Sequence, residues 1–380
     1  MKRNIFLRFL IVFLALTAFL VGYLVIRGDG PVSPQSKTGT ILDKFDNNKQ
    51  LTTSDPKLAE EEPFVVADRK VVSITNSPDK KGVIYFEKNT GKLFEFNFET
   101  KQELAISDIM LPNFMSAIWS PADREAIGYF ASNTSAIFKY LNTKTNQEVP
   151  LDQNIRSAAF SPTGDLIAYY YADPNNSPDI SSEELDQNGL PGPATIEPNK
   201  IFIAQPDGTY PKKILNTRLE DIKLSWPTEE WLVFKTPASE IFLLNKEGGL
   251  NKFLESQHLL EEKWSRSGKK MLYSTLSDDM EIAEPVLWVK ELDSRSKKYL
   301  ETGGNASRCV WSIDDINIFC ALAESPSADE IYLINTSDGS RKFIFDPETS
   351  IKELLLSSSE DYLLFVSASN ERLYAIKISD

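Results

Sequence analysis

The chain has 380 residues, of which 41% are hydrophobic and 11% aromatic, so it can bury a large core. Its formal net charge of −14 argues against nucleic acid and an anionic membrane surface as main partners, because an excess of lysine and arginine binds both. A single histidine, His258, excludes mechanisms that need two imidazoles, and two cysteines, Cys309 and Cys320, are too few for a disulfide scaffold or a cysteine-rich zinc site.

The N-terminal residues predict a membrane anchor. Lys2, Arg3 and Arg8 precede an uncharged run over residues 9–26. As a helix this run spans roughly 27 Å, close to the hydrocarbon core of a bilayer. The positive residues predict that residues 1–8 are a cytoplasmic stub. The alternative is a cleaved signal peptide, but the apolar run is longer than usual and no small-x-small cleavage site comes after it.

Residues 27–62 predict a flexible linker. They are rich in Gly, Pro, Ser, Thr, Asp and Lys, and no period of 2 or 3.6 persists among them. An anchor and a cleaved signal peptide would both export the rest of the chain. We therefore expect a single-pass protein of the cell membrane, with residues 63–380 outside the cytoplasm of a prokaryotic cell.

From residue 63 onward one unit repeats seven times. Each copy contains an aliphatic residue followed by an aromatic one in an apolar strand. The seven pairs are Leu93-Phe94, Ile137-Phe138, Ile201-Phe202, Ile241-Phe242, Leu287-Trp288, Ile331-Tyr332 and Leu373-Tyr374. The steps between them are 44, 64, 40, 46, 44 and 42 residues, so the third unit carries an insertion. Units of this length cannot bury their apolar faces alone and must stack into one body.

Each unit contains strands joined by polar turns. The clearest turn is Ser161-Pro162-Thr163-Gly164-Asp165, which precedes an apolar strand. Proline fixes φ and lacks an N–H, so it belongs in the turn and not in the ladder. A strand before the turn and a short strand at the end of the unit bring the total to four antiparallel strands, which indicates a β-propeller blade. A solenoid of helix pairs is an alternative fold with a similar repeat length. The proline turns and the scarcity of apolar residues at helical spacing disfavour it.

These motifs resemble a known family. The Trp-Ser-Pro turn at 119–121, the turn at 161–165 and the Asp-Gly pairs at 207–208 and 338–339 resemble TolB-type, WD-like propeller repeats. They are also similar to the propeller of the dipeptidyl peptidase family. The resemblance covers about residues 64–380 and implies an all-β, seven-bladed β-propeller that assists transport, binds proteins or peptides, or gates a hydrolase domain. No Gly-x-Ser-x-Gly elbow and no hydrolase domain are present in this sequence, so we expect that the protein is not an enzyme.

The two ends of the repeat region predict how the ring closes. The seventh unit ends after its aliphatic–aromatic strand, at Ile378, and has no fourth strand. Phe64-Val65-Val66 forms an unassigned strand before the first unit. We expect this segment to pair beside Leu373–Ile378, because the pairing would cover an open sheet edge.

The sequence offers few candidate sites. The insertion at residues 172–199 is rich in acidic, Asn, Pro and Gly residues, and it is interpreted as a solvated loop, a partner-contact loop or a calcium loop. Cys309 and Cys320 flank one turn symmetrically, so they form either a disulfide or two buried thiols. His258 is interpreted as structural. The carboxylates at 278–284 are too ordinary in a chain with 55 acidic residues to assign a glycosidase pair.

The sequence thus predicts a membrane-anchored, extracytoplasmic propeller that acts as a protein- or ligand-binding or scaffolding module. The alternative is a propeller enzyme that acts on sugars or peptides at the central channel. The expected partners are an unidentified protein or small ligand at a propeller face, and the membrane through the N-terminal helix. We assign no catalytic, cofactor or metal residue and expect no nucleic acid.

Overall fold

The computed structural model of the protein describes residues 62–132, 137–172, 198–258, 260–276, 284–294, 296–325 and 328–378. The predicted stub, the transmembrane segment at 9–26 and almost the whole linker lie outside these residues. Within the described ranges, no helix is long and apolar enough to cross a membrane. The N-terminal anchor therefore stays a prediction.

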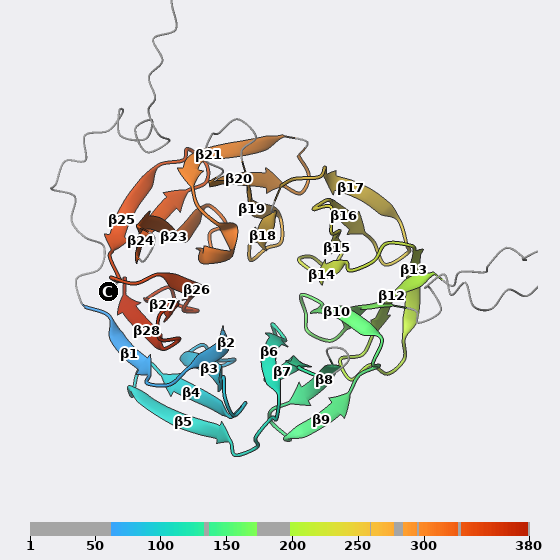
Figure 1. Ribbon diagram of the computed structural model, residues 1–380, viewed down its shortest axis with the longest axis horizontal. Coiled ribbons are helices and arrows are strands. Elements are labelled where there is room, and N and C mark those ends of the chain that lie inside the picture. Colours follow the sequence, from blue (N-terminus) through green and yellow to red (C-terminus); the bar gives the residue numbers. More distant parts are fainter. Residues whose placement is uncertain are drawn as a thin grey trace, which may run out of the picture. The chain divides into compact units, whose positions relative to one another are not determined.

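Seven four-stranded antiparallel sheets surround one axis, which confirms the predicted seven-bladed β-propeller (Figure 1). Blade 1 contains β2 (Val71–Asn76), β3 (Gly82–Glu87), β4 (Leu93–Asn97) and β5 (Gln102–Ser107). Blade 2 contains β6 (Phe114–Trp119), β7 (Glu125–Phe130), β8 (Ile137–Asn142) and β9 (Gln147–Pro150). Blade 3 contains β10 (Ile155–Phe160), β11 (Ile167–Tyr171), β12 (Asn199–Ala204) and β13 (Lys212–Thr217).

The remaining blades repeat this order from the axis to the rim. Blade 4 contains β14 (Lys223–Ser225), β15 (Leu232–Lys235), β16 (Ile241–Leu244) and β17 (Leu250–Leu254). Blade 5 contains β18 (Glu261–Trp264), β19 (Lys270–Leu276), β20 (Pro285–Glu291) and β21 (Lys297–Gly303). Blade 6 follows a short 3-10 helix, η2 (Ala306–Arg308), with β22 (Cys309–Trp311), β23 (Asn317–Ser325), β24 (Ala328–Asn335) and β25 (Arg341–Phe345). Blade 7 contains β26 (Ile351–Leu356), β27 (Tyr362–Ser367), β28 (Leu373–Lys377) and β1 (Phe64–Ala67).

Blade 7 is built from both ends of the propeller sequence. Its outer strand, β1, pairs antiparallel with β28, with Phe64 opposite Ala375 and Val65 opposite Tyr374. This confirms the predicted ring closure. An apolar cluster that joins blade 7 to blade 1 packs behind it and includes Val66, Phe94 and Leu364.

A second contact at the closure is electrostatic. The Glu371 carboxylate, in the turn before β28, is bridged by Lys88 at 2.5 Å, Lys352 at 3.0 Å and Lys70 at 3.3 Å. Lys70 and Lys88 belong to blade 1, and the Val71 N–H also donates to the Glu371 backbone oxygen at 2.9 Å. Hydrogen bonds from Lys88 and Lys352 hold the pKa of Glu371 at about 2. One side chain therefore ties the last blade to the first.

The Ser-Pro turns share one construction between the first and second strands. The Gly164 N–H donates to the Ser161 carbonyl at 2.9 Å, and the Leu166 N–H donates to Ser161 Oγ at 3.2 Å. Gly164 has a φ of 76°, the left-handed conformation that suits glycine. The same two bonds form around Ser77, Ser265 and Ser357. The repeated serine is thus a buried part of the turn.

The aliphatic–aromatic pairs mark one register position. In six blades the aromatic residue of the third strand lies opposite an aromatic residue of the second strand. These pairs are Tyr85–Phe94, Tyr129–Phe138, Tyr169–Phe202, Phe234–Phe242, Tyr273–Trp288 and Phe365–Tyr374. In blade 6, Tyr332 lies opposite Cys320. Aromatic pairs contribute about 0.5–1.5 kcal/mol beyond the area they bury, which explains why the pattern recurs.

We expect the Glu371→Gln substitution to weaken ring closure by about 1–2 kcal/mol at neutral pH. The loss is this small because the three lysines are half-exposed and solvent screens their charges. Because folding depresses this pKa from 4.5 to about 2, the stabilisation is complete above pH 4.5 and disappears as the pH falls towards about 2. Urea unfolding followed by tryptophan fluorescence at several pH values measures the difference. The exposed Glu247→Gln variant is the control. If the loss of unfolding free energy in Glu371→Gln stays the same as the pH falls, the clamp is contradicted.

Candidate functional site

The strands nearest the axis differ sharply in charge. These inner strands are β2, β6, β10, β14, β18, β22 and β26 (Figure 1). Strands β2, β6 and β22 contain no charged residue, whereas β18 contains Glu261, Glu262 and Lys263, and β26 contains Lys352 and Glu353. Strands β10 and β14 add one basic residue each, Arg156 and Lys223, so acidic residues on the inner strands occur only in blades 5 and 7.

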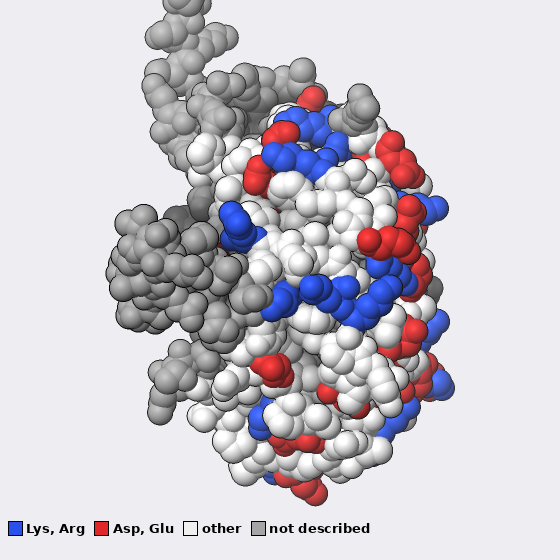
Figure 2. Space-filling view, turned by 90° about the vertical axis from the view of Figure 1, so that its right-hand side faces the viewer, with Lys and Arg blue, Asp and Glu red and all other residues white. Residues whose placement is uncertain are grey.

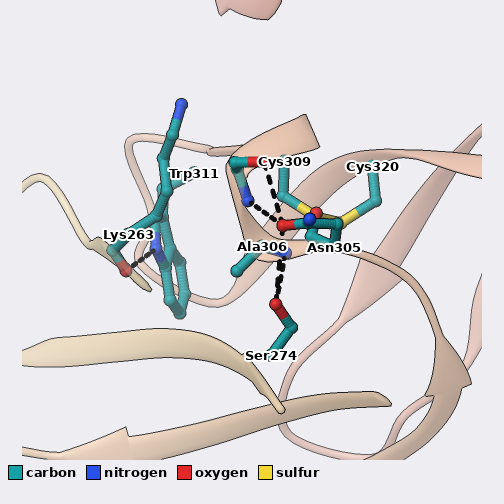
Figure 3. Close-up of a disulfide and its surroundings, with 8 residues drawn as sticks. Lys263, Ser274, Asn305, Ala306, Cys309, Trp311 and Cys320 are labelled. Carbon is teal, nitrogen blue, oxygen red and sulfur yellow. Dashed lines mark hydrogen bonds between the residues drawn. A yellow bond between two sulfur atoms is a disulfide. The ribbon is translucent and has the colours of Figure 1, made fainter. Parts of the chain in front are cut away.

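Lys263 occupies a position where other blades have uncharged residues. It lies opposite Leu272 in the ladder, one residue before the turn tryptophan, where blades 2, 6 and 7 have Ile118, Val310 and Leu355. Burial lowers the pKa of the Lys263 amine, and the negative charge of Glu353 partly offsets this. The Lys263 carbonyl accepts a hydrogen bond from Trp311 Nε1 at 3.1 Å, which fixes the strand against blade 6 (Figure 3).

Glu353 is the partner of Lys263 on blade 7. A register shift between Ile351 and Glu353 interrupts the regular pairing of β26 with β27 at this point. Burial raises the pKa of the Glu353 carboxyl, against the positive charges of Lys263 and Lys352. Two partly desolvated groups of opposite charge, on different blades and each acting on the other's pKa, are the kind of arrangement found at functional sites.

A second charged pair is structural. Lys235 Nζ contacts Glu262 Oε2 at 2.7 Å and donates to the Leu260 carbonyl at 3.0 Å, which links blades 4 and 5. Burial raises the pKa of Glu262, and Lys235 opposes this shift. Each charge satisfies the other at the interface of two blades, so we do not include this pair in the site.

The side of the ring opposite β18 is apolar. Strand β6 of blade 2 exposes Met115 by 51% and Ile118 by 39%, although both lie on an innermost strand. Figure 1 places β6 across the axis from β18. We call Lys263, Glu353, Met115 and Ile118 the axial site. It combines two charged groups with an apolar surface.

The structure also has a small, open pocket between blades 1 and 2. Its floor is apolar and includes Phe86, Leu93 and Leu141. Its one carboxylate, Glu148, forms an ion pair with Lys139 at 2.9 Å. The pocket therefore offers apolar area without a reactive group, and the axial site is the stronger candidate.

Cys309 and Cys320 form a disulfide in the structure (Figure 3). They lie directly opposite each other on β22 and β23, and both are fully buried. Beside them, the Ala306 N–H of η2 donates to Ser274 Oγ of blade 5 at 3.1 Å. Cys320 occupies the second-strand position that is aromatic in the other blades, opposite Tyr332. The disulfide fixes the inner strand of blade 6, which lies between the two charged blades of the axial site.

The other sequence candidates do not join this site. His258 is exposed before β18, and its backbone carbonyl accepts bonds from Leu276 N at 3.1 Å and Thr275 Oγ1 at 3.0 Å. The acidic insertion at 173–197 and the carboxylates at 278–281 lie outside the described residues, and Glu284 is exposed. In the part of the chain that the structure describes, no group of three or more His, Cys, Asp or Glu side chains could hold a metal ion.

Sequence reasoning missed Lys263 and Glu353. The signal at Lys263 was a charged residue at an inner-strand position that is uncharged in blades 2, 6 and 7. No such signal marks Glu353, because blades 4 and 5 have Lys223 and Glu261 at its position.

Comparison with known proteins shows the fold. No protein-family model and no curated protein matches the chain. An oligogalacturonate lyase in complex with manganese aligns with a TM-score of 0.59 and 11% identity over 81% of this chain and 89% of the other. A second oligogalacturonate lyase, from Vibrio parahaemolyticus, gives 0.57 and 12% over 84% and 92%. The WD40 repeats of RRP9 give 0.54 and 10% over 85% and 99%.

These neighbours correct one expectation. The prediction that the protein is not an enzyme is contradicted, because the two lyases share this architecture over most of both chains. The lack of a serine nucleophile motif and of a hydrolase domain argues only against hydrolysis by a serine nucleophile. A propeller can carry catalytic residues itself.

The mutual influence of Lys263 and Glu353 is testable. We expect the Glu353→Gln substitution to lower the pKa of Lys263 further, because it removes the negative charge that stabilises the ammonium form. The pH dependence of Lys263 acetylation, followed by mass spectrometry, measures this pKa. The exposed Glu247→Gln variant is the matched control and should leave the Lys263 profile unchanged. An identical profile in wild type and Glu353→Gln would show that the two groups do not interact.

Proposed function

We propose that the protein is a binding module whose axial site holds a small ligand with one polar, charged side and one apolar face. The seven-bladed propeller fold suits a binding or scaffolding role. The observation that carries the proposal is that Lys263 and Glu353 are both partly desolvated and act on each other's pKa, and that the strand of Lys263 lies across the axis from the strand of Met115 and Ile118. Charged groups that are partly removed from water interact more strongly with a ligand than solvated ones do.

The chemistry of the site favours a sugar acid. The Lys263 ammonium can bind a carboxylate, and the Glu353 carboxylate can accept hydrogen bonds from hydroxyl groups. The apolar face of a sugar ring can contact Met115 and Ile118. The likeness to oligogalacturonate lyases makes a short galacturonate oligomer the natural first probe.

A second candidate function is an enzyme that cleaves such a sugar by elimination. Burial lowers the pKa of Lys263, so a larger fraction of this amine is neutral than for a solvated lysine. A neutral amine can act as a general base. It would take the proton from the carbon next to the carboxylate, a carbon–carbon double bond would form, and the glycosidic oxygen would leave with its electron pair.

One experiment separates the two candidates. The full chain is titrated with trigalacturonate by calorimetry, and the ultraviolet absorbance of an unsaturated product is followed in parallel. We expect binding that weakens about tenfold or more in Lys263→Met, because a desolvated charge pair is broken, and that is unchanged in the exposed control Lys80→Gln. Product formation that depends on Lys263 would establish the enzyme. If trigalacturonate neither binds nor is converted to product, both candidate functions are contradicted.

We further propose that the propeller is displayed outside the cytoplasm on an N-terminal transmembrane segment at 9–26. The uncharged run, the positive residues before it and the Cys309–Cys320 bond support this, since disulfides persist in oxidising compartments. We expect protease added to spheroplasts to degrade the propeller. Degradation that occurs only after the membrane is permeabilised would contradict this location.

A further inference from the structure

The outer strands carry positive charge in only part of the ring. Strands β13, β21 and β25 each begin with two basic residues. These pairs are Lys212-Lys213, Lys297-Lys298 and Arg341-Lys342, which we call the basic belt. The outer strands of blades 1, 2 and 7 contain no basic residue. In blade 4 the single Lys252 is neutralised by Glu240 and Glu255.

The belt has a common register. Lys212, Lys298 and Lys342 each lie opposite the residue that follows the third-strand aromatic. Blades 1 and 2 have Leu104 and Pro150 at this position. Because the blades repeat the same geometry around the axis, equivalent register positions lie at the same height on the outer wall. The lysines therefore form a row at one level of the ring.

Several of these charges are uncompensated. Among the described residues, no carboxylate lies within ion-pair distance of Lys212, Lys213 or Lys342. Lys297 lies over the Trp288 ring at 4.7 Å. An aromatic face holds a cation in place without neutralising it. Positive charge thus accumulates locally on a chain whose net charge is −14.

Figure 2 shows the side of the propeller that carries β13 and β17. Lysine and arginine side chains form a continuous band across the middle of this side, and acidic side chains lie around the band. Of the three pairs of the belt, only Lys212-Lys213 belongs to a strand on this side, and blade 4, whose Lys252 is ion-paired, separates it from the pairs of blades 5 and 6.

We propose that the basic belt binds an anionic polysaccharide along the outer wall of blades 3, 5 and 6. The belt extends over a convex surface, so a flat membrane would contact only a small part of it, whereas a flexible polymer can follow the curve. Half-buried rings, Trp288, Tyr299 and Tyr332, stand beside the cations and offer apolar surface to sugar rings. The strongly acidic remainder of the protein repels a dense polyanion such as nucleic acid more than a sparsely charged sugar polymer.

Binding of fluorescent polygalacturonate to the full chain, at several salt concentrations, tests this proposal. We expect the affinity to fall as salt rises and to fall about tenfold in the triple variant Lys212→Gln/Lys213→Gln/Lys342→Gln, because three uncompensated charges are lost. Lys80→Gln/Lys269→Gln removes exposed lysines at turns and should bind like wild type. All variants are compared in a Lys263→Met background, in which the axial site is disabled, so that the result reports on the belt alone.

Further arms keep the result interpretable. The triple arginine variant at the same three positions retains charge and should retain binding, and thermal melts show that the variants are folded. Neutral dextran should not bind. Unchanged binding in the triple glutamine variant would overturn the proposal, and so would tighter binding of poly-L-glutamate, which would identify an acidic peptide as the partner.

Discussion

The pairing of β1 with β28 is the contact on which the rest of the propeller depends. Single four-stranded blades bury their apolar residues only against neighbouring blades, as the cluster shared by blades 7 and 1 illustrates. Without β1, blade 7 would present an open edge and the ring would have two free ends. The strand pairing, the apolar cluster behind it and the Glu371 clamp act at the same junction.

A closed ring is what creates the axial site. Lys263 and Glu353 belong to blades 5 and 7, and blade 6 stands between them with its disulfide and the Trp311 bond to the Lys263 carbonyl. Each residue shifts the pKa of the other because the fold holds both partly away from solvent. Neither strand could produce this environment alone. The outer belt, in contrast, needs only the repeated register of the blades.

The architecture was predictable because its signals are local. The Ser-Pro turns, the aliphatic–aromatic strands and the unassigned Phe64–Val66 segment each indicate their structure within a few residues, and the repeat multiplies the signal. The axial site was not predictable in the same way. Its two charges come from separate repeats and from different positions of the inner strand, since Glu353 lies two residues further from the turn than Lys263 does. The expectation of a non-enzymatic protein failed because it rested on an absent nucleophile motif and an absent hydrolase domain, which exclude only one type of chemistry.

Amide hydrogen exchange of the full chain tests ring closure most directly. If β1 closes the propeller, the amides of Val65–Ala67 that face β28 will exchange slowly and at rates similar to those of Leu373–Lys377. Exchange of the β1 amides at the rate of an unstructured peptide, while β28 stays protected, would contradict the closed ring.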